Sequence, residues 1–195
     1  MAELKEREIL IAGFGGQGIV LTGNILGKAA TLFDRQHATL TQSYGPEARG
    51  GSCSAQVILS ADEILFPYVE RPEMLVCMSQ EGFAKNVRLL QPGGTLIWDT
   101  DLVKVADLDP SFVAYHVPAT RFAEEMGNQM MANIVMLGFI SAVSDLVTVE
   151  ALKQAVLESV PPKTREKNEA AFNRGREYGE AILKSRSNLE KSREQ

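Results

Sequence analysis

A glycine-rich segment, LIAGFGGQGIV at residues 10–20, constrains the fold of this chain more than any other stretch. Four of the six residues from Gly13 to Gly18 are glycines, although glycine loses more backbone entropy on folding than any other residue. The preceding EILIAGF is an apolar run typical of a buried strand, and the following IVLTGNILGKAATL repeats its apolar residues at helical spacing. The pattern predicts a Rossmann-like strand–loop–helix unit, with backbone amides that can receive an anion where the helix begins.

The motif GFGGQG satisfies the G-x-G-x-x-G pattern of dinucleotide-binding proteins. That pattern also requires an acidic residue at the end of the second strand, about 20 residues further on, to hold a ribose hydroxyl. The second predicted strand ends instead in Thr41, Gln42 and Ser43. The sequence therefore argues against NAD. It leaves two interpretations: a cradle for another phosphate-bearing ligand, or glycines that only let the helix pack closely against the strand.

Apolar patterns in the remainder of the chain predict one α/β domain over residues 1–183 and a polar, frayed tail over residues 184–195. Further strands are predicted at 37–45, 53–60, 72–78, 95–99 and 112–117, and helices at 80–90, 120–127, 128–144, 149–160 and 163–185. Ser79 and Thr148 each directly precede one of these helices and are predicted to be their N-caps. The segment 61–69 is predicted to return from strand 53–60 as an antiparallel hairpin arm, with Pro67 at the sheet edge. The expected fold class is a mixed sheet, with a parallel core plus this antiparallel hairpin, and helices clustered in the C-terminal third.

Composition excludes several classes of function. The formal net charge of −5 argues against nucleic acid as a partner, since nucleic-acid-binding proteins usually present a basic face. The longest uncharged apolar stretch, at 130–143, is too short for a membrane crossing, which takes roughly 20 residues. The charged start of the sequence lacks a signal-peptide layout. A cytoplasmic location without membrane attachment is therefore expected.

The two cysteines, Cys53 and Cys77, lie in separate strand-like segments, and the sequence has no C-x-x-C motif. Iron–sulfur clusters and structural zinc sites usually take four ligands, most of them closely spaced cysteines. The chain is therefore expected to bind no metal by itself and to keep both thiols reduced in its core.

A second loop, TQSYGPEARGGS at residues 41–52, is built from a Gly-Pro turn and a Gly-Gly turn. Between these turns, Glu47 and Arg49 are expected to point outward on a short loop. A guanidinium group suits a phosphate or another planar anion, so the loop is a candidate anion site. The alternative is a solvated surface turn without a ligand.

Together the two loops carry a family resemblance. GFGGQGIVLTGNILGKAA followed by SYGPEARGGSCSAQVILS resembles the gamma subunit of the 2-oxoacid:ferredoxin (acceptor) oxidoreductases. These two motifs are most similar to those of the 2-oxoglutarate branch of the family. The pyruvate and ketoisovalerate members have similar residues at the same positions. The resemblance continues in QPGGTLIWDTDLV, NQMMANIVMLGFISA and PPKTREKNEAAFNRG, and it spans residues 7–180.

The resemblance implies an enzyme that decarboxylates a 2-oxoacid on thiamine diphosphate, passes electrons through iron–sulfur clusters to ferredoxin and transfers the acyl group to coenzyme A. This chain has neither a G-D-G…N-N thiamine diphosphate motif nor a cysteine set for a cluster. Those cofactors are therefore expected on alpha, beta and ferredoxin-like delta subunits, and no catalytic residue is expected here. The gamma subunit is then expected to help bind coenzyme A and to assemble the complex.

The candidate coenzyme A residues come from both loops. The first loop supplies the turn at Gly13 and backbone donors, and the second supplies side chains. The full set is Gly13, Gly15, Gly16, Gln17, Gly18, Thr22, Ser43, Tyr44 and Arg49. Arg49 either contacts coenzyme A or docks the alpha subunit. Two other functions stay open, a stand-alone nucleotide-dependent oxidoreductase and a purely structural bridging subunit, and a homodimer of the isolated chain is also compatible with the sequence.

Other conspicuous residues are expected to be structural. Asp99 and Asp101 follow a predicted strand and are expected to cap the loop after it. Gly175 and Gly179 lie four residues apart on one helical stripe, which predicts close packing against a neighbouring helix. Polar residues at the head of the apolar helix are expected to be caps or contacts to a partner subunit: Asn128, Gln129 and Asn133.

Overall fold

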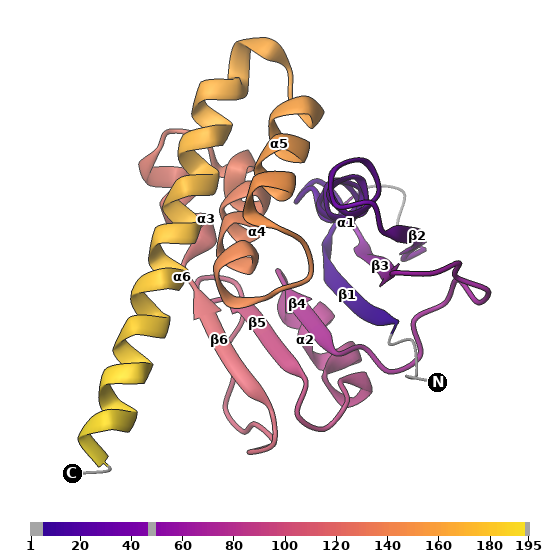
Figure 1. The fold of residues 1–195 in the computed structure, drawn as a ribbon. Helices are drawn as coiled ribbons and strands as arrows, with labels where there is room; N and C mark the ends of the chain where they lie inside the picture. Colours follow the sequence, from indigo (N-terminus) through magenta and orange to yellow (C-terminus); the bar gives the residue numbers. More distant parts are fainter. Residues whose placement is uncertain (1–5, 47–49, 194–195) are drawn as a thin grey trace.

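The computed structural model describes residues 6–46 and 50–193, and its centre is a six-stranded mixed sheet (Figure 1). The strand order is β2-β3-β1-β4-β5-β6. The strands are β1 (Arg7–Phe14), β2 (His37–Tyr44), β3 (Ser52–Ser60), β4 (Met74–Cys77), β5 (Thr95–Asp99) and β6 (Val113–Val117). Strands β1, β4, β5 and β6 form the parallel core, as predicted, and β3 pairs antiparallel with both β1 and β2.

The antiparallel hairpin is formed by β2 and β3, so the prediction that residues 61–69 form its second arm is wrong. Tyr44 pairs with Cys53, and the second glycine-rich loop connects the two strands. The segment 61–73 contains no strand; it is held by side chains instead. Gln56 Oε1 accepts from Val69 N–H at 3.2 Å, and Glu8 Oε2 accepts from the next two amides at 2.8 Å.

The first βα unit forms as predicted, but its sheet neighbour differs from a Rossmann fold. Strand β1 leads through the glycine loop into α1 (Ile19–Lys28), which continues as the π-helical turn η1 (Ala29–Phe33). Strand β2 then runs in the same direction as β1, since both are antiparallel to β3. Because β3 lies between them, the glycine loop faces a hairpin rather than a second parallel strand.

Two layers of unequal size cover the sheet. One face carries α1, α3 (Ala119–Glu125), α4 (Ala132–Val143), α5 (Val149–Ser159) and α6 (Arg165–Arg193). The other face carries the short α2 (Gln80–Asn86), the turn η2 (Val87–Leu89) and the segment 102–112. Ile9 and Ile11 point to the first layer and Leu10 to the second, which is the alternation expected of a strand buried on both faces. Two further short turns are η3 (Gln129–Met131) and η4 (Pro162–Thr164).

Two helices begin at caps that the sequence predicted. The Ser79 hydroxyl accepts from Gly82 N–H at 3.0 Å at the start of α2. The Thr148 hydroxyl accepts from Ala151 N–H at 3.2 Å at the start of α5. Each cap satisfies an amide that has no partner within the helix, and the two caps are confirmed.

Helices α4 and α6 pack against each other through glycines, which confirms the prediction for Gly175 and Gly179. A Cβ atom at Gly175 would overlap the carbonyl of Val135 on α4. A Cβ atom at Gly138 on α4 would likewise overlap the carbonyl of Phe172 on α6. The two helix backbones therefore touch directly, and Phe172 is fully buried at their crossing.

Helix α6 continues through the segment that was predicted to fray, as far as Arg193, and the predicted boundary at residue 183 lies inside it. Contacts of Arg186 with β6 help to keep this part of α6 helical. Its guanidinium group donates to the Ala114 carbonyl and lies 4.2 Å from the centre of the Tyr115 ring, so α6 remains attached to β6 at this position. Among the described residues, no helix combines the length and apolar character that a membrane crossing requires.

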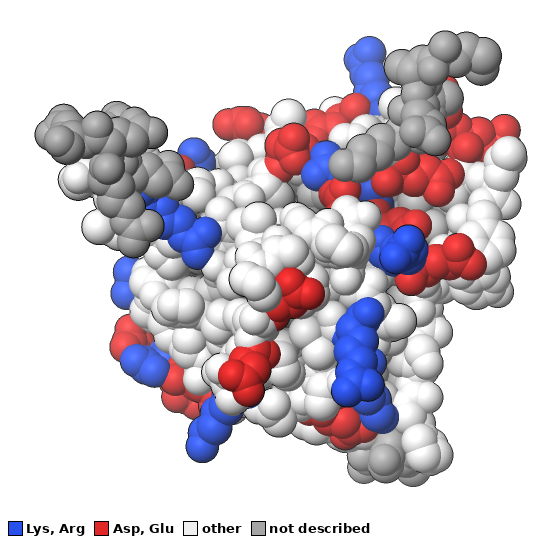
Figure 2. Space-filling model, turned by 90° about the horizontal axis from the view of Figure 1, so that it is seen from below, with Lys and Arg blue, Asp and Glu red and all other residues white. Residues whose placement is uncertain are grey.

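Charged residues are unevenly distributed at the end of the molecule where β4, β5 and β6 begin. Figure 2 looks onto this end and shows a broad, mostly uncharged centre with Lys, Arg, Asp and Glu gathered mainly around it. Leu65, Phe66 and Tyr68, in the segment after β3, are all more than half exposed. The glycine loop lies at the opposite end of the sheet, where β1 and β4 finish.

Candidate functional site

The glycine loop makes a tight turn between β1 and α1. Gly16 has φ +97° and Gly18 has φ +74°, both in the left-handed region that favours glycine. Gly18 is also the N-cap of α1, and its carbonyl accepts the first helical bond, from Thr22 N–H at 2.8 Å. The turn therefore leaves the amides of the first helical residues without partners inside the helix.

Some of the predicted backbone donors are engaged within the protein. Gly15 N–H donates to Gly51 O at 2.8 Å, which ties the first loop to the second. Gln17 N–H donates to Phe14 O at 3.2 Å, which closes the turn. These two amides therefore hold the shape of the loop, and their contact with an anion stays a prediction. The amides of Gly16, Gly18 and the first turn of α1 remain as candidate donors.

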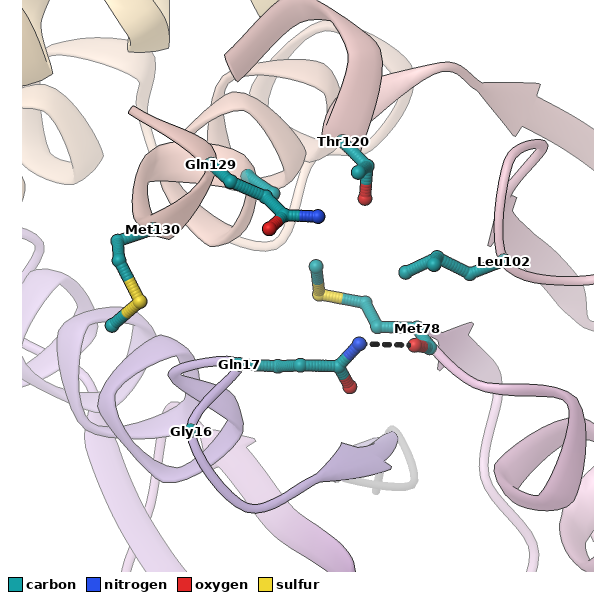
Figure 3. Close-up of a pocket in the computed structure, with 8 residues that line it drawn as sticks. Gly16, Gln17, Met78, Leu102, Thr120, Gln129 and Met130 are labelled. Atoms are coloured by element: carbon teal, nitrogen blue, oxygen red, sulfur yellow. Dashed lines mark hydrogen bonds between the residues drawn. The ribbon is translucent and has the colours of Figure 1, made fainter. Parts of the chain in front are cut away.

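The Gln17 side chain clamps the loop, a role that its place in the motif did not indicate. Its Oε1 accepts from Phe14 N–H at 2.6 Å. Its Nε2 donates to Met78 O at 2.8 Å, just beyond the end of β4 (Figure 3). One side chain therefore fixes the ends of two neighbouring parallel strands relative to the loop.

Gly13 and Thr22 support the loop from below. Gly13 is buried within β1, where a Cβ atom would overlap the side chains of Gln17 and Ile19. Thr22 is fully buried, and its hydroxyl donates to Gly18 O at 2.9 Å. The Thr22 hydroxyl therefore has a structural role in this loop, and its contact with a ligand stays a prediction. Glycine at position 13 lets α1 pack closely on β1, which is one of the two interpretations of the glycine-rich loop in the sequence analysis.

A pocket of about 150 Å³ lies against the loop at the carboxyl ends of the parallel strands. This is the usual place for a ligand in an open α/β sheet. Gly16 and Gln17 form one wall. In Figure 3, Met78 and Gln129 point toward each other across the space, and Leu102 points in from the side. No charged side chain lines this pocket among the described residues, so its polar groups are backbone amides, the carboxamides of Gln17 and Gln129 and the hydroxyl of Thr120.

The segment Asn128 to Asn133 contributes more to the site than the sequence indicated. Asn128 is a cap, as predicted, and accepts from Met130 N–H at 3.1 Å. Gln129 and Met130 line the pocket, and buried Asn133 donates from Nδ2 to Gly18 O at 3.4 Å. The sequence signal was the run of polar residues before an apolar helix, but nothing in it indicated contact with residues more than a hundred positions earlier.

Asp99 and Asp101 organise the loop after β5, as predicted. Asp99 is fully buried and accepts from Thr120 N–H at 2.8 Å and from the Thr120 hydroxyl at 2.6 Å. It also accepts from Asp101 N–H at 2.9 Å, while Asp101 pairs with Arg121. Burial raises the pKa of the Asp99 carboxyl, although its hydrogen bonds oppose that shift. Thr120 lines the pocket, so Asp99 fixes one of its walls.

The second loop places its predicted residues in a different pocket. Ser43 and Tyr44 border a space of about 240 Å³ beside Ser54 and Lys85, on the sheet face that carries α2. Gly45 N–H donates to Ser52 O at 2.7 Å and closes the hairpin. Arg49 lies outside the described residues. The two predicted loops therefore meet at the Gly15–Gly51 bond, but their candidate residues line two separate pockets.

Both cysteines are buried within the sheet. Burial raises the pKa of the Cys77 thiol to about 12 and also raises the pKa of Cys53. Because the thiolate is the reactive species, both thiols are expected to react with a disulfide reagent far more slowly than cysteines in the unfolded chain. Titration with and without denaturant measures this. Rapid labelling of the native protein at mildly alkaline pH would contradict it.

Comparisons with known proteins agree on one family. The family model of pyruvate ferredoxin/flavodoxin oxidoreductase matches residues 8–178. The 2-oxoglutarate synthase subunit KorC of Methanothermobacter thermautotrophicus is 47% identical over 177 residues, which cover 88% of this chain and 94% of that protein. The gamma subunit of a keto/oxoacid ferredoxin oxidoreductase from Geobacter sulfurreducens PCA superposes with a TM-score of 0.79 at 35% identity, over 90% of this chain and 99% of that one.

A third protein shares the fold. The 2-oxoglutarate:ferredoxin oxidoreductase of Magnetococcus marinus, solved with 2-oxoglutarate, coenzyme A and succinyl-CoA bound, has a TM-score of 0.78 at 22% identity. The match covers 94% of this chain but 32% of that one, so there the same fold is part of a longer polypeptide. From the family match, the identity and the shared fold together, the chain belongs to the pyruvate ferredoxin/flavodoxin oxidoreductase family and is a gamma-type subunit of an oxoacid:ferredoxin oxidoreductase.

Proposed function

We propose that this chain is the gamma subunit of an enzyme that converts 2-oxoglutarate, coenzyme A and oxidised ferredoxin into succinyl-CoA, carbon dioxide and reduced ferredoxin. The 47% identity to a 2-oxoglutarate synthase subunit, over nearly the whole of both chains, supports this substrate. Within that enzyme the chain helps to bind coenzyme A and to hold the complex together. The observation that carries this role is the pocket between the glycine loop and η3.

The pocket fits the thiol-bearing arm of coenzyme A better than its phosphates. Met78, Leu102 and Met130 offer apolar surface to an alkyl chain. The carboxamides of Gln17 and Gln129 offer polar partners for the amide groups of that arm. A volume of about 150 Å³ holds only a slender part of so large a molecule. The amides of Gly16 and Gly18, at the start of α1, favour a negatively charged group near its mouth.

The reaction chemistry belongs to other chains of the complex. Thiamine diphosphate and the iron–sulfur clusters are assigned to alpha, beta and ferredoxin-like delta subunits, since this sequence has no G-D-G…N-N motif and only two cysteines, both buried. Those groups supply the decarboxylation and the electron transfer when bound there. This chain contributes position, because a held thiol near the acyl intermediate reacts far faster than a thiol in free solution. Arg49 stays a predicted contact to coenzyme A or to the alpha subunit.

Replacing Gln17 with alanine tests this role in the reconstituted complex. The variant loses both clamping bonds, to Phe14 N–H and to Met78 O, so the loop and the pocket wall lose their fixed position. We expect the KM for coenzyme A to rise roughly tenfold, with little change in the KM for 2-oxoglutarate. Steady-state kinetics with each substrate varied in turn measures both constants. Gln154→Ala, an exposed glutamine on α5, is the matched control.

The other functions give different results in the same experiments. A purely structural bridging subunit would leave the KM for coenzyme A unchanged in Gln17→Ala and would alter assembly alone. A stand-alone nucleotide-dependent oxidoreductase would bind NAD or NADP as an isolated chain, which calorimetry detects, and would turn over without partners. Faster turnover of pyruvate than of 2-oxoglutarate by the reconstituted complex would contradict the proposed substrate.

A further inference from the structure

Two arginines and two aspartates line a groove at the end of the sheet where β4, β5 and β6 begin. This arginine–aspartate groove has a volume of about 460 Å³. Arg71 precedes β4, Arg88 lies on η2, and Asp107 and Asp109 precede β6. The glycine-loop pocket, which is the space of about 150 Å³ beside the glycine loop, lies at the opposite end of the parallel strands. The groove is therefore separate from the site described above.

The order of the strands separates the two kinds of charge in this groove. Strands β4, β5 and β6 are neighbours in the sheet in that order, and the segments before them are tied together by backbone bonds. Gln91 N–H donates to Pro72 O at 3.1 Å, and Val113 N–H donates to Gly94 O at 2.9 Å. Helix α2, which η2 continues, packs on β1, β3 and β4. The arginines therefore lie on the β4 side of the groove and the aspartates on the β6 side.

The four charged side chains do not neutralise one another. Within residues 6–46 and 50–193, none of the four forms an ion pair with another residue. All four are exposed. The Asp109 carboxylate accepts from Ser111 N–H at 2.9 Å, which holds it at the edge of the groove. Charges of both signs in fixed positions are able to pair with a surface that carries the opposite pattern.

The surface between the charges is apolar. Leu90 is buried and Phe112 is half-buried, and both pack on the core under α2. Leu89, at the rim, is 48% exposed. Figure 2 shows the mostly uncharged centre of this end, with charged residues mainly around it. Exposed apolar side chains beside arginines are typical of protein–protein interfaces, so the groove fits a protein surface better than a small ion.

A second copy of this chain carries the complementary pattern. A two-fold rotation about an axis that lies in the interface, between the two sides of the groove, places the basic side of one copy against the acidic side of the other. The same rotation brings the two apolar centres together. Such an interface uses one patch on both copies, which is the commonest arrangement in protein oligomers. An acidic partner would be repelled by the aspartates, and a basic partner by the arginines.

We propose that this end of the sheet is the interface between two copies of this chain, in which Arg71 and Arg88 of one copy face Asp107 and Asp109 of the other. Leu89 of each copy contributes to the apolar centre of the interface. Because the groove and the glycine-loop pocket lie at opposite ends of the parallel strands, this interface leaves the pocket accessible to other subunits. The complex then contains two copies of the gamma subunit in direct contact.

Charge reversal in the isolated full chain tests this interface by analytical ultracentrifugation. We expect the wild-type chain to be a dimer. Arg71→Glu with Arg88→Glu, and separately Asp107→Lys with Asp109→Lys, are each expected to raise the dissociation constant about a hundredfold, because like charges then face each other. An equimolar mixture of the two double variants is expected to form a dimer with the affinity of the wild type. In that mixture, every reversed charge meets a charge of opposite sign.

The apolar centre is tested without changing any charge. Leu89→Ser is expected to raise the dissociation constant roughly tenfold. Lys184→Glu and Leu189→Ser, on the exposed part of α6, are the matched controls and are expected to leave it unchanged. Circular dichroism verifies that each variant is folded.

Three results would overturn the proposal. The first is a wild-type chain that stays monomeric. The second is a dimer that all the groove variants leave intact, which would place the interface elsewhere. The third is a mixture of the two double variants that stays monomeric although each alone has lost the dimer. If a monomeric wild-type chain binds an alpha subunit and the groove variants lose that binding, the surface belongs to the alpha subunit and not to a second copy.

Discussion

Replacing Gly138 with alanine is expected to lower the free energy of unfolding by about 3 kcal/mol or more. The added Cβ would overlap the Phe172 carbonyl on α6, and a backbone atom cannot move aside as a flexible side chain can. The two helices must separate, which opens the packing around Phe172 and Phe139. Urea unfolding followed by circular dichroism measures the change. Gly175→Ala, which faces the Val135 carbonyl in the same crossing, is expected to behave alike.

Gly27→Ala in α1 is the control for the effect of helix propensity. A Cβ at this position would lie 3.7 Å from the Ala38 Cβ, which is an ordinary contact, so only the backbone entropy changes. This variant is expected to be neutral or to gain about 0.5–1 kcal/mol. If Gly138→Ala unfolded at the same urea concentration as the wild type, the close crossing of α4 and α6 would be incorrect.

Replacing Asp99 with alanine is expected to lower the free energy of unfolding by about 3 kcal/mol. The change leaves Thr120 N–H, the Thr120 hydroxyl and Asp101 N–H without their acceptor in a buried position. Because Thr120 lines the glycine-loop pocket, the same variant is expected to raise the KM for coenzyme A in the complex. Urea unfolding and steady-state kinetics measure the two effects.

The contribution of the Asp99 carboxyl to stability depends on pH with a definite sign. Burial raises the pKa of Asp99 in the folded protein above 3.8, so its stabilising contribution is largest when the carboxyl is protonated. The contribution falls as the pH rises from about 3.8 through the raised pKa. The stability difference between wild type and Asp99→Asn is therefore expected to grow between neutral pH and about pH 4. A difference that shrinks on acidification would contradict the raised pKa.

Local chemistry made several elements predictable. Ser79 and Thr148 precede helices because a hydroxyl there satisfies an orphan amide, and that requirement does not depend on the rest of the fold. Strands such as β4 and β5 are buried on both faces, so their continuous apolar runs are evident in the sequence. The glycines of α6 were correctly linked to helix packing, although their partner helix was not identified.

The hairpin error has a physical cause. The segment 61–69 contains Ile64, Leu65, Phe66 and Val69, and it reads as a strand on residue type alone. Strand β3 is hydrogen-bonded to β1 on one side and to β2 on the other. The segment 61–69 therefore has no free edge of β3 with which to pair. The order of strands in a sheet depends on competition between distant segments, which residue preferences do not contain.

In the candidate site, too, some features could be predicted from local sequence and others depended on contacts between distant segments. The two glycine-rich loops could be found because glycine at positive φ and Gly-Pro turns mark their positions along the chain. The Gln17 clamp, the wall formed by Met78 and Gln129, and the contact of Asn133 with Gly18 could not be found. These contacts join residues that are distant in the sequence, and they exist only after α4 has packed beside α1.

The sequence by itself determined the strand–loop–helix unit, the helix caps and the family, because these depend on residue type and short spacing. The tertiary structure alone decided that β3 lies between β1 and β2, that two loop amides are engaged within the protein, and that two pockets of different polarity flank one strand end. The reason is that a hydrogen bond or a pocket wall requires partners at short distance in space. Folding brings those partners together from distant segments, and the local sequence pattern of one segment does not indicate which other segment it will contact.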